Sequence, residues 1–331
     1  MSTPPEPAVH VLHENPEWMP PFREAFAAEG VPLVEHVLAG GELDLAEVPA
    51  PGVWWSRMSA SAHTREHTAS VAHTRAVLSW LDAAGARTVN GRAVLELELS
   101  KVAQLTALAA AGIEVPRTTA VVGADLAAAA RRFAERVGGP FVTKHSQGGK
   151  GLGVARFSGY EEFADTLASG GLEEPFDGVW LLQEFVASAD DSVTRAEFVG
   201  GEFLYALRAD TARGGFQLCP ADTCAIDPDT GRPVLPPGAT IAQEPGETIF
   251  SLREEFEHPV LARYAEFLQR NGIEIAGVEF ITTADGRVVT YDVNTNTNYN
   301  AAVDAVAPRS GPREIARYTG RLLQQRSGAG S

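Results

Sequence analysis

A segment late in the chain, residues 277–300 (GVEFITTADGRVVTYDVNTNTNYN), constrains the fold more than any other part of this sequence. Two runs rich in β-branched and aromatic residues flank Asp285-Gly286, a dipeptide that favours the two-residue turn of a β-hairpin. With that turn, Glu279 pairs with Asp292, and side-chain alternation places both carboxylates and Asn294 on one face. The other, apolar face then carries Val278, Phe280, Tyr291 and Val293.

The paired carboxylates of this hairpin indicate a metal site. Two acids that face each other across a strand pair repel and weaken the sheet. A hard cation between them reverses the sign of the interaction, because Mg²⁺ binds carboxylate and amide oxygens. The alternative is a solvent-exposed hairpin face that tolerates two acids. The hairpin alone does not decide between the two interpretations.

Composition favours a globular protein of two or three domains that does not bind nucleic acid. The chain has 331 residues, a formal net charge of −16 at pH 7 and 44% hydrophobic residues. Nucleic-acid partners require a basic footprint, and an anionic membrane surface is disfavoured for the same reason. No apolar run is long enough to span a bilayer, and the first residues lack a signal-peptide pattern. Because the only cysteines are Cys219 and Cys224, we expect a reducing cytoplasm.

The first third of the chain alternates strands and helices, which predicts a small open α/β domain. We expect strands at 9–13, 31–36 and 53–57 and helices at 18–29 and 64–84. No glycine-rich dinucleotide fingerprint follows the first strand. Arg57 comes at the end of the third strand, and open α/β sheets collect ligands at strand carboxyl ends. It is either a contact for an anionic substrate or a surface arginine.

A glycine-rich loop follows in the middle of the chain. Residues 146–153 (SQGGKGLG) join two predicted strands. Backbone amides freed of side chains can close on phosphates, and Lys150 adds positive charge, although a flexible hairpin loop is the alternative. The loop lacks the Ser or Thr that follows Gly-Lys in a P-loop. Lys144 ends the apolar strand before it, where a lysine is costly unless its ammonium meets an anion.

The last part of the chain adds a buried strand, a second hairpin and a long loop. The strand at 180–186 contains Gln183-Glu184, and the hairpin at 193–208 carries Arg195 and Arg208. Residues 211–251 are rich in Gly and Pro and hold both cysteines, and so long a connection is typical of a lid. Helices are expected at 254–271 and 312–325.

Taken together, these segments resemble the ATP-grasp superfamily, and most closely its RimK-like carboxylate–amine ligases. The resemblance covers almost the whole chain, from WSRMS through the segments 89–116 and 141–154 to LLQEFV and the GVEF…DVN hairpin. It implies an α/β fold with α+β character in the nucleotide-binding part. An N-terminal open α/β domain (residues 1–115) precedes two α+β subdomains (116–186 and 187–331) that sandwich ATP.

The resemblance also implies a role for each matching residue. Lys144 and Arg208 match charge-stabilising catalytic groups, and Asp190 or Asp191 matches the ribose contact. The implied metal ligands are Glu279, Asp292 and Asn294, which agrees with the pairing argument, and two Mg²⁺ ions are expected, with Mn²⁺ as a substitute. The implied ATP-binding set is Lys101, Lys144, Gly149, Lys150, Gly151, Gly153, Gln183, Glu184, Val186 and Asp191.

The sequence departs from the family after the metal strand. The family often has Glu-Val-Asn followed by a small residue, Pro and Gly, whereas this chain has DVNTNTNYN. Asn296 and Asn298 therefore offer side-chain amides to a substrate, and Arg57 and Arg195 are further candidate substrate contacts.

The implied activity is that of an ATP-dependent ligase, which activates a carboxylate as an acyl phosphate and joins it to an amine. The expected substrates are small-molecule carboxylates and amines, namely amino acids or small peptides. A ligase that extends a protein tail, an ATP-grasp kinase of a polyol or sugar phosphate, and a nucleotide-binding regulator without turnover are the alternatives. A homo-oligomer is left open, and no nucleic-acid or membrane partner is expected.

Overall fold

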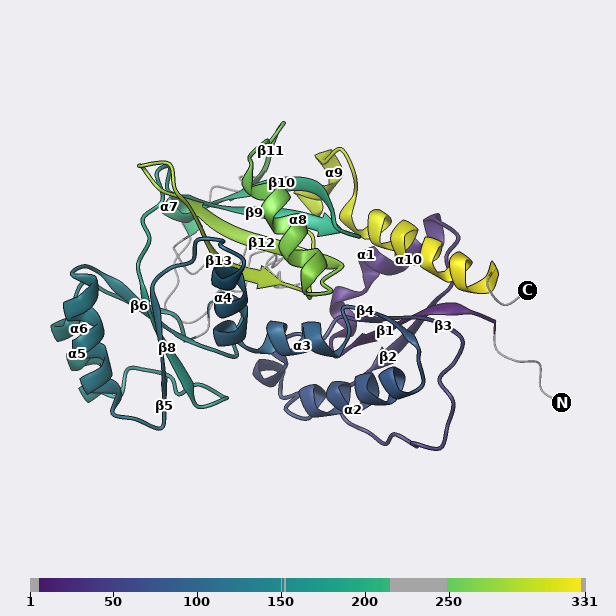
Figure 1. Ribbon diagram of the computed structural model, residues 1–331, viewed down its shortest axis with the longest axis horizontal. Coiled ribbons are helices and arrows are strands. Elements are labelled where there is room, and N and C mark those ends of the chain that lie inside the picture. Colours follow the sequence, from purple (N-terminus) through teal and green to yellow (C-terminus); the bar gives the residue numbers. More distant parts are fainter. Residues whose placement is uncertain (1–5, 150, 152, 215–248, 329–331) are drawn as a thin grey trace, which may run out of the picture.

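The computed structural model describes residues 6–149, 151, 153–214 and 249–328, and this part of the chain forms three sheets (Figure 1). The N-terminal sheet is parallel, in the order β2-β1-β3-β4. Its strands are β1 (Ala8–His13), β2 (Leu33–Val37), β3 (Gly52–Ser56) and β4 (Arg87–Val89). The expected open α/β arrangement is therefore present.

Helices cover both faces of the parallel sheet (Figure 1). On one face, Phe22 and Phe26 of α1 (Pro20–Ala28) pack on Trp55, and α10 (Gly311–Gly328) lies beside α1. On the other face, α2 (Ser70–Ala83) and α3 (Arg92–Leu99) pack against Trp54. Alternate residues of one strand thus enter two cores. None of the helices in the described part of the chain combines the length and apolar character that crossing a bilayer requires.

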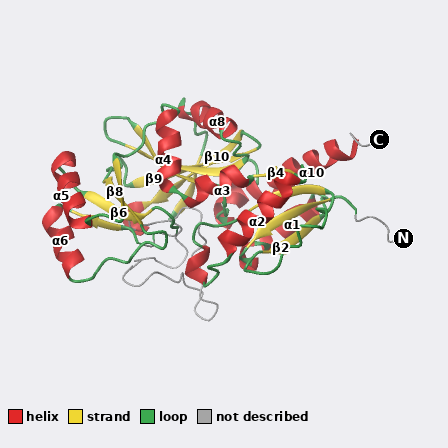
Figure 2. Ribbon diagram, turned by 60° about the horizontal axis from the view of Figure 1, so that its bottom comes forward, coloured by secondary structure: helices red, strands yellow, loops and turns green. Residues whose placement is uncertain are grey.

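The central sheet is antiparallel, in the order β5-β8-β6-β7, and has its own core. Its strands are β5 (Thr118–Val122), β6 (Phe141–His145), β7 (Ala155–Phe157) and β8 (Val179–Glu184). Phe133 of α5 (Leu126–Val137) and Phe163 of α6 (Tyr160–Ala168) pack on Phe141, so both helices cover one face (Figure 2). The predicted glycine-rich loop connects β6 to β7.

The C-terminal sheet is antiparallel, in the order β11-β10-β9-β12-β13. Its strands are β9 (Ser192–Val199), β10 (Glu202–Asp210), β11 (Phe250–Arg253), β12 (Ile275–Thr282) and β13 (Val288–Asn294). On one face α8 (Val260–Arg270) and α4 (Lys101–Ala110) bury Phe280 and Val293. The short helix α7 (Thr211–Gly214) follows β10, and the short helix α9 (Ala301–Val306) follows β13.

The N-terminal domain and the C-terminal sheet share one core, whereas the central sheet does not join it. Apolar residues of β1, β3 and α1 pack in one cluster with residues of β9, β10 and α10. Asn90, at a φ of +51°, adds polar contacts: its side chain bonds the backbone of Glu274, Ile275 and Thr295. The N-terminal domain is therefore fixed to the sheet that carries the predicted metal ligands.

The hairpin of β12 and β13 corrects the predicted turn while keeping the predicted pair. Thr282 pairs with Val288, so the loop is longer than Asp285-Gly286 alone. A register shift between Glu279 and Phe280 then restores the pairing of Glu279 with Asp292. A β-bulge inserts one extra residue and reverses the facing beyond it.

This bulge moves Tyr291 off the predicted apolar face. Thr290 takes the buried position instead, where its Oγ1 lies 2.6 Å from Tyr264 Oη. Tyr291 lines a cavity on the opposite side. The prediction that Tyr291 shares a face with Val278 and Phe280 is therefore wrong, because turn residues alone do not reveal a bulge.

Other differences concern element boundaries. The helix predicted at 254–271 begins only at Val260 because Pro259 disfavours helical backbone before it. The predicted helix at 64–84 is a short 3₁₀ turn, Ala62–Arg65, followed by α2. The strands β4 and β11 and the helices α3, α7 and α9 were not expected, and both α7 and β11 overlap the ends of the segment 211–251 that was predicted to be a loop. Lys150 and residues 215–248, with Cys219, Cys224 and most of the predicted lid, lie outside the described residues.

Candidate active site

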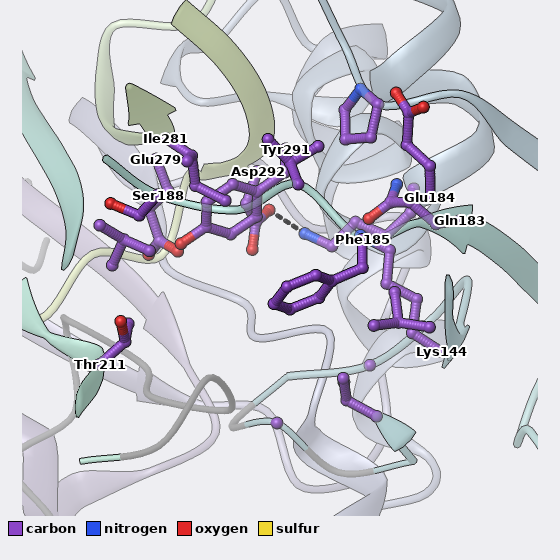
Figure 3. A pocket seen from close by; sticks show the side chains of 18 of the residues that line it. Lys144, Gln183, Glu184, Phe185, Ser188, Thr211, Glu279, Ile281, Tyr291 and Asp292 are labelled. Carbon is purple, nitrogen blue, oxygen red and sulfur yellow. Dashed lines mark hydrogen bonds and ion pairs between the residues drawn. The ribbon is translucent and has the colours of Figure 1, made fainter. Parts of the chain in front are cut away.

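A cavity of about 280 Å³ lies between the central and C-terminal sheets (Figure 3). Its lining comes from α4, β6, the glycine-rich loop, the segment after β8, and strands β12 and β13. Val142, Phe185, Ile281 and Tyr291 supply apolar walls, and charged groups gather at one end. Apolar walls with a few placed polar groups are typical of small-molecule sites.

The three predicted metal ligands lie together in this cavity. Glu279 is the direct cross-strand neighbour of Asp292, and Asn294 Nδ2 donates a hydrogen bond of 2.9 Å to Glu279 Oε1. Figure 3 shows Glu279 and Asp292 side by side. Within the described residues, no cluster of three or more side chains drawn from His, Cys, Asp and Glu alone is arranged to hold a metal ion. The set formed here has two carboxylates and an amide, which are the oxygen ligands that Mg²⁺ prefers.

The two carboxylates differ in their electrostatic surroundings. Burial raises the pKa of Glu279 to about 7, against the lowering effect of Arg195. Burial acts in the same direction on Asp292, but the ammonium groups of Lys101 and Lys144 outweigh it and lower the pKa of that carboxyl. A divalent cation would favour the charged form of both groups, so the donor set fits a cation.

Two lysines stand at the charged end of the cavity, and only one of them is paired. Lys101, at the first position of α4, forms an ion pair with Asp292. Lys144 of β6 has no hydrogen-bond or ion-pair partner within the described part of the chain. Burial, with a smaller contribution from Lys101, lowers the pKa of Lys144 to about 8. An unpaired ammonium in a cavity fits an anionic ligand such as a phosphate.

The glycine-rich loop contributes to the wall of the cavity. Gly149 and Gly151 are among the lining residues. Gly153 is not, but it has a φ of +69°, and a Cβ there would collide with the His145 ring. Gly149 approaches the N-terminal domain, since a Cβ there would lie 3.1 Å from Ser61 Cβ. Small residues are therefore required for the observed path of the loop.

The segment after β8 forms another wall, and its side chains are tied to β5. Gln183 Nε2 donates to Thr118 Oγ1 at 2.9 Å, and Glu184 Oε1 accepts from Arg117 N at 2.8 Å. Gln183, Glu184 and Val186 all line the cavity, and their role beside an adenine ring stays a prediction. Phe185, which belongs to the same segment but was not singled out as an ATP-binding residue, also lines the cavity.

The structure separates the two candidate ribose acids. Asp191, at a φ of +49°, lines the cavity. Asp190 instead accepts hydrogen bonds from Ser188 and Ser192 and lies 3.4 Å from Arg253.

Arg208 is not part of the cavity lining. It donates to the backbone oxygen of Asp190 at 2.9 Å and forms an ion pair with Asp210 at 3.3 Å. Its predicted catalytic role would require its side chain to leave these acids, and that role stays a prediction.

The four candidate substrate residues, Arg57, Arg195, Asn296 and Asn298, are not part of the cavity lining. Arg57 is buried and donates to Thr297 O at 3.1 Å and Asn298 Oδ1 at 2.7 Å. Burial lowers the pKa of Arg57 to about 9. Asn296 Oδ1 is buried without a hydrogen bond among the described groups. Arg195 is fully buried beside Glu279.

Comparison with known proteins identifies the fold. No family model and no curated protein matches the sequence. The structure of the D-cycloserine synthetase DcsG matches with a TM-score of 0.65 and 19% identity, over 96% of this chain and 100% of that chain. A RimK-domain ATP-grasp protein from Sphaerobacter thermophilus matches with a TM-score of 0.63 and 19% identity, over 94% and 98%. The ATP-grasp ligase PsnB with minimal precursor gives 0.64 and 17%, over 97% and 99%.

The chain has the ATP-grasp fold. The fold expected from the resemblance is therefore confirmed over nearly the full length. In ATP-grasp terms, the cavity lies between the two subdomains that were expected to sandwich the nucleotide. The roles of individual residues rest on the geometry above.

Proposed function

We propose that this chain is an ATP-dependent carboxylate–amine ligase that forms an amide through an acyl phosphate. The observation that carries the proposal is the charged end of the cavity, where the unpaired Lys144 lies near the facing carboxylates of Glu279 and Asp292. The ammonium group of Lys144 would bind phosphate oxygens, and the two carboxylates would bind the cation that accompanies the phosphates. The apolar walls beside Phe185 and Ile281 suit an adenine ring.

Each group has a definite task in this scheme. Glu279, Asp292 and Asn294 would hold two Mg²⁺ ions, replaceable by Mn²⁺, which offset the phosphate charge when bound. Lys101 and Lys144 would bind the remaining phosphate charge, together with the backbone amides of the glycine-rich loop. Asp191 would take the ribose.

The reaction proceeds in two transfers. An oxygen of the substrate carboxylate forms a bond to the γ-phosphorus of ATP, the bond to the bridging oxygen breaks, and ADP leaves. The nitrogen of the amine substrate then attacks the acyl carbon, phosphate leaves with the bonding electron pair, and the nitrogen loses a proton. The chain must orient both substrates and exclude water, because the acyl phosphate would otherwise hydrolyse.

The solved relatives in fold bear on the substrates. One is a D-cycloserine synthetase, PsnB is an ATP-grasp ligase that was solved with a precursor peptide, and MdnC is a macrocyclase bound to its precursor peptide. We therefore propose that the carboxylate and the amine belong to amino acids or peptides. Of the three asparagines in residues 295–300, Asn298 and Asn300 use their side-chain oxygens on Arg57 and on the first turn of α9. Asn296, whose Oδ1 has no hydrogen bond among the described groups, is the one whose amide would contact such substrates. A cytoplasmic location agrees with the use of ATP.

A single assay tests the proposal. The purified chain is incubated with ATP, Mg²⁺ and pooled amino acids or short peptides, and ADP, free phosphate and new amides are measured. Equal release of ADP and phosphate, dependent on the added substrates and lost in Asp292→Asn, is expected. ADP without free phosphate in the presence of polyols or sugars would indicate a kinase instead, and ATP binding without turnover would indicate a regulator.

A further inference from the structure

Three neighbouring strands place the metal ligands in a grid of six positions. In one row, Asp292 of β13 pairs with Glu279 of β12, which pairs on its other side with Arg195 of β9. In the next row, Asn294 pairs with Gly277, which pairs with Glu197. Side chains two residues apart on a strand share a face, so these six positions face the same side of the sheet. The glycine is the one position without a side chain.

The guanidinium of Arg195 occupies the space above Gly277. A Cβ on Gly277 would collide with Nε, Nη2 and Cζ of Arg195. Gly277 has no positive φ, so the backbone conformation does not require a glycine there. The close approach of the guanidinium is therefore the reason for glycine at this position.

Arg195 is held on three sides in a fully buried environment. Its Nε donates to Glu197 Oε1 at 2.6 Å, and its Nη2 donates to Thr297 Oγ1 at 2.6 Å. The Thr297 hydroxyl in turn donates to Glu197 Oε2 at 3.1 Å. The remaining nitrogen, Nη1, donates to Glu279 Oε1 at 2.8 Å. A guanidinium is a planar fork, so these contacts fix its orientation as well as its position.

The cluster contains one guanidinium and two carboxyl groups. Arg195, Glu197 and Glu279, which supply them, are all buried. Arg195 donates to both carboxyl groups, and Thr297 donates to Glu197 as well. Arg195 and Asn294 both donate to the same oxygen of Glu279, Oε1. The carboxylate is therefore oriented before any cation arrives.

We propose that Arg195 is a positioning residue for the cation site: held by Glu197 and Thr297, it fixes the Glu279 carboxylate, and Gly277 is required because it admits the guanidinium. This assigns Arg195 a role other than the substrate contact expected from the sequence. Groups that orient metal ligands commonly contribute tenfold or more to metal affinity. The inference rests on the proposed function, since it concerns the divalent cation that accompanies the nucleotide.

Metal binding tests the inference apart from catalysis. Mn²⁺ is titrated into the full chain in the presence of ADP and followed by electron paramagnetic resonance, while ADP affinity without metal is measured by calorimetry in EDTA. For Gly277→Ala and Arg195→Lys, we expect Mn²⁺ affinity to fall about tenfold or more, with metal-free ADP affinity within twofold. Gly139→Ala is the matched control, because its added methyl group meets open space.

The outcomes separate the inference from the proposed function. If the unmodified chain binds no Mn²⁺ with ADP, the proposed function fails, and the inference fails with it. If it binds Mn²⁺ and both variants bind it equally well, only the inference is overturned. An equal loss of Mn²⁺ and metal-free ADP affinity also overturns it, since that indicates general disruption. Should either variant not fold, Thr297→Val, which removes one support of the guanidinium, must still lower Mn²⁺ affinity selectively; unchanged affinity refutes the inference.

Discussion

Replacing Lys144 by methionine should stabilise the ligand-free protein and weaken its affinity for ATP. Burial lowers the pKa of Lys144 from 10.5 to about 8. One pKa unit corresponds to about 1.4 kcal/mol, so the upper bound is about 3 kcal/mol of destabilisation, and partial access to solvent reduces it to about 1–3 kcal/mol. Between pH 8 and 10.5 the unfolded chain binds this proton more tightly than the folded chain. The cost is therefore fully present below pH 8 and disappears as the pH rises towards 10.5.

Lys144→Met should stabilise the ligand-free protein, but it should make nucleotide binding less favourable. Removing one partner of a buried charge contact costs about 2–4 kcal/mol, which corresponds to a dissociation constant about 30- to 1,000-fold higher. Calorimetry with ATP and Mg²⁺ measures this change, and chemical denaturation at pH 7 without ligand measures stability. Lys101→Met is the matched control. Because Lys101 has an ion pair with Asp292, losing it should destabilise the ligand-free protein as well as weaken ATP binding.

Two results would refute this reasoning. If Lys144→Met destabilised the ligand-free protein as much as Lys101→Met does, the ammonium of Lys144 would have a favourable partner in solution. If ATP affinity changed by less than threefold, the ammonium would not contact the nucleotide. Either result would also remove the main support for the proposed phosphate end of the cavity.

Three further substitutions test other parts of the structure. Gly153→Ala should weaken ATP binding about tenfold or more, because Gly153 has a φ of +69° and a Cβ there would collide with the His145 ring; unchanged binding relative to Gly139→Ala would contradict this. Burial lowers the pKa of His36 to about 4 and also lowers that of His10. The unfolded chain therefore binds more protons, so stability should fall as the pH drops from 6.5 towards 4; His36→Gln should flatten that slope in urea titrations. Asn90→Ala should lower the free energy of unfolding by about 2–4 kcal/mol, since it leaves buried backbone groups without their hydrogen bonds; a loss below 1 kcal/mol in denaturant titrations would count against it.

The sequence predicted the strands well where alternation and turn residues agree. The pairing of Glu279 with Asp292 is present because the hairpin must bury Val278 and Phe280 against α8. The turn itself was predicted one residue too short. A bulge compensates for that error, and bulges depend on packing against other elements, which no local pattern encodes. The helix α3 was missed because its apolar residues merge with those of α4 in the sequence.

For the site, too, local sequence patterns predicted some residues and missed those whose positions depend on packing. The sequence located Lys144 by its cost in a strand, and Lys144 does line the cavity without a hydrogen-bond or ion-pair partner among the described residues. Tyr291 was not anticipated as a lining residue, since its facing depends on the bulge. Ile281 was overlooked, although it shares the face of Glu279 by simple alternation along β12. The environment of Arg57 could not be predicted from the sequence either. Its contact with Asn298 joins residues 241 positions apart, and only the shared core of the N-terminal domain and C-terminal sheet brings them together.

The separation of cores explains why the two lysines differ. Lys101 belongs to α4, which packs on the C-terminal sheet, so it is always near Asp292 and pairs with it. Lys144 belongs to the central sheet, whose core is separate, and it approaches those acids without contacting them. A nucleotide between the sheets would give Lys144 an anion and relieve the cost of its burial. This stabilisation requires the central and C-terminal sheets to contact the same nucleotide. ATP binding should therefore hold the central sheet in a fixed position relative to the rest of the chain. The unpaired lysine would thus favour the ATP-bound arrangement over the ligand-free one.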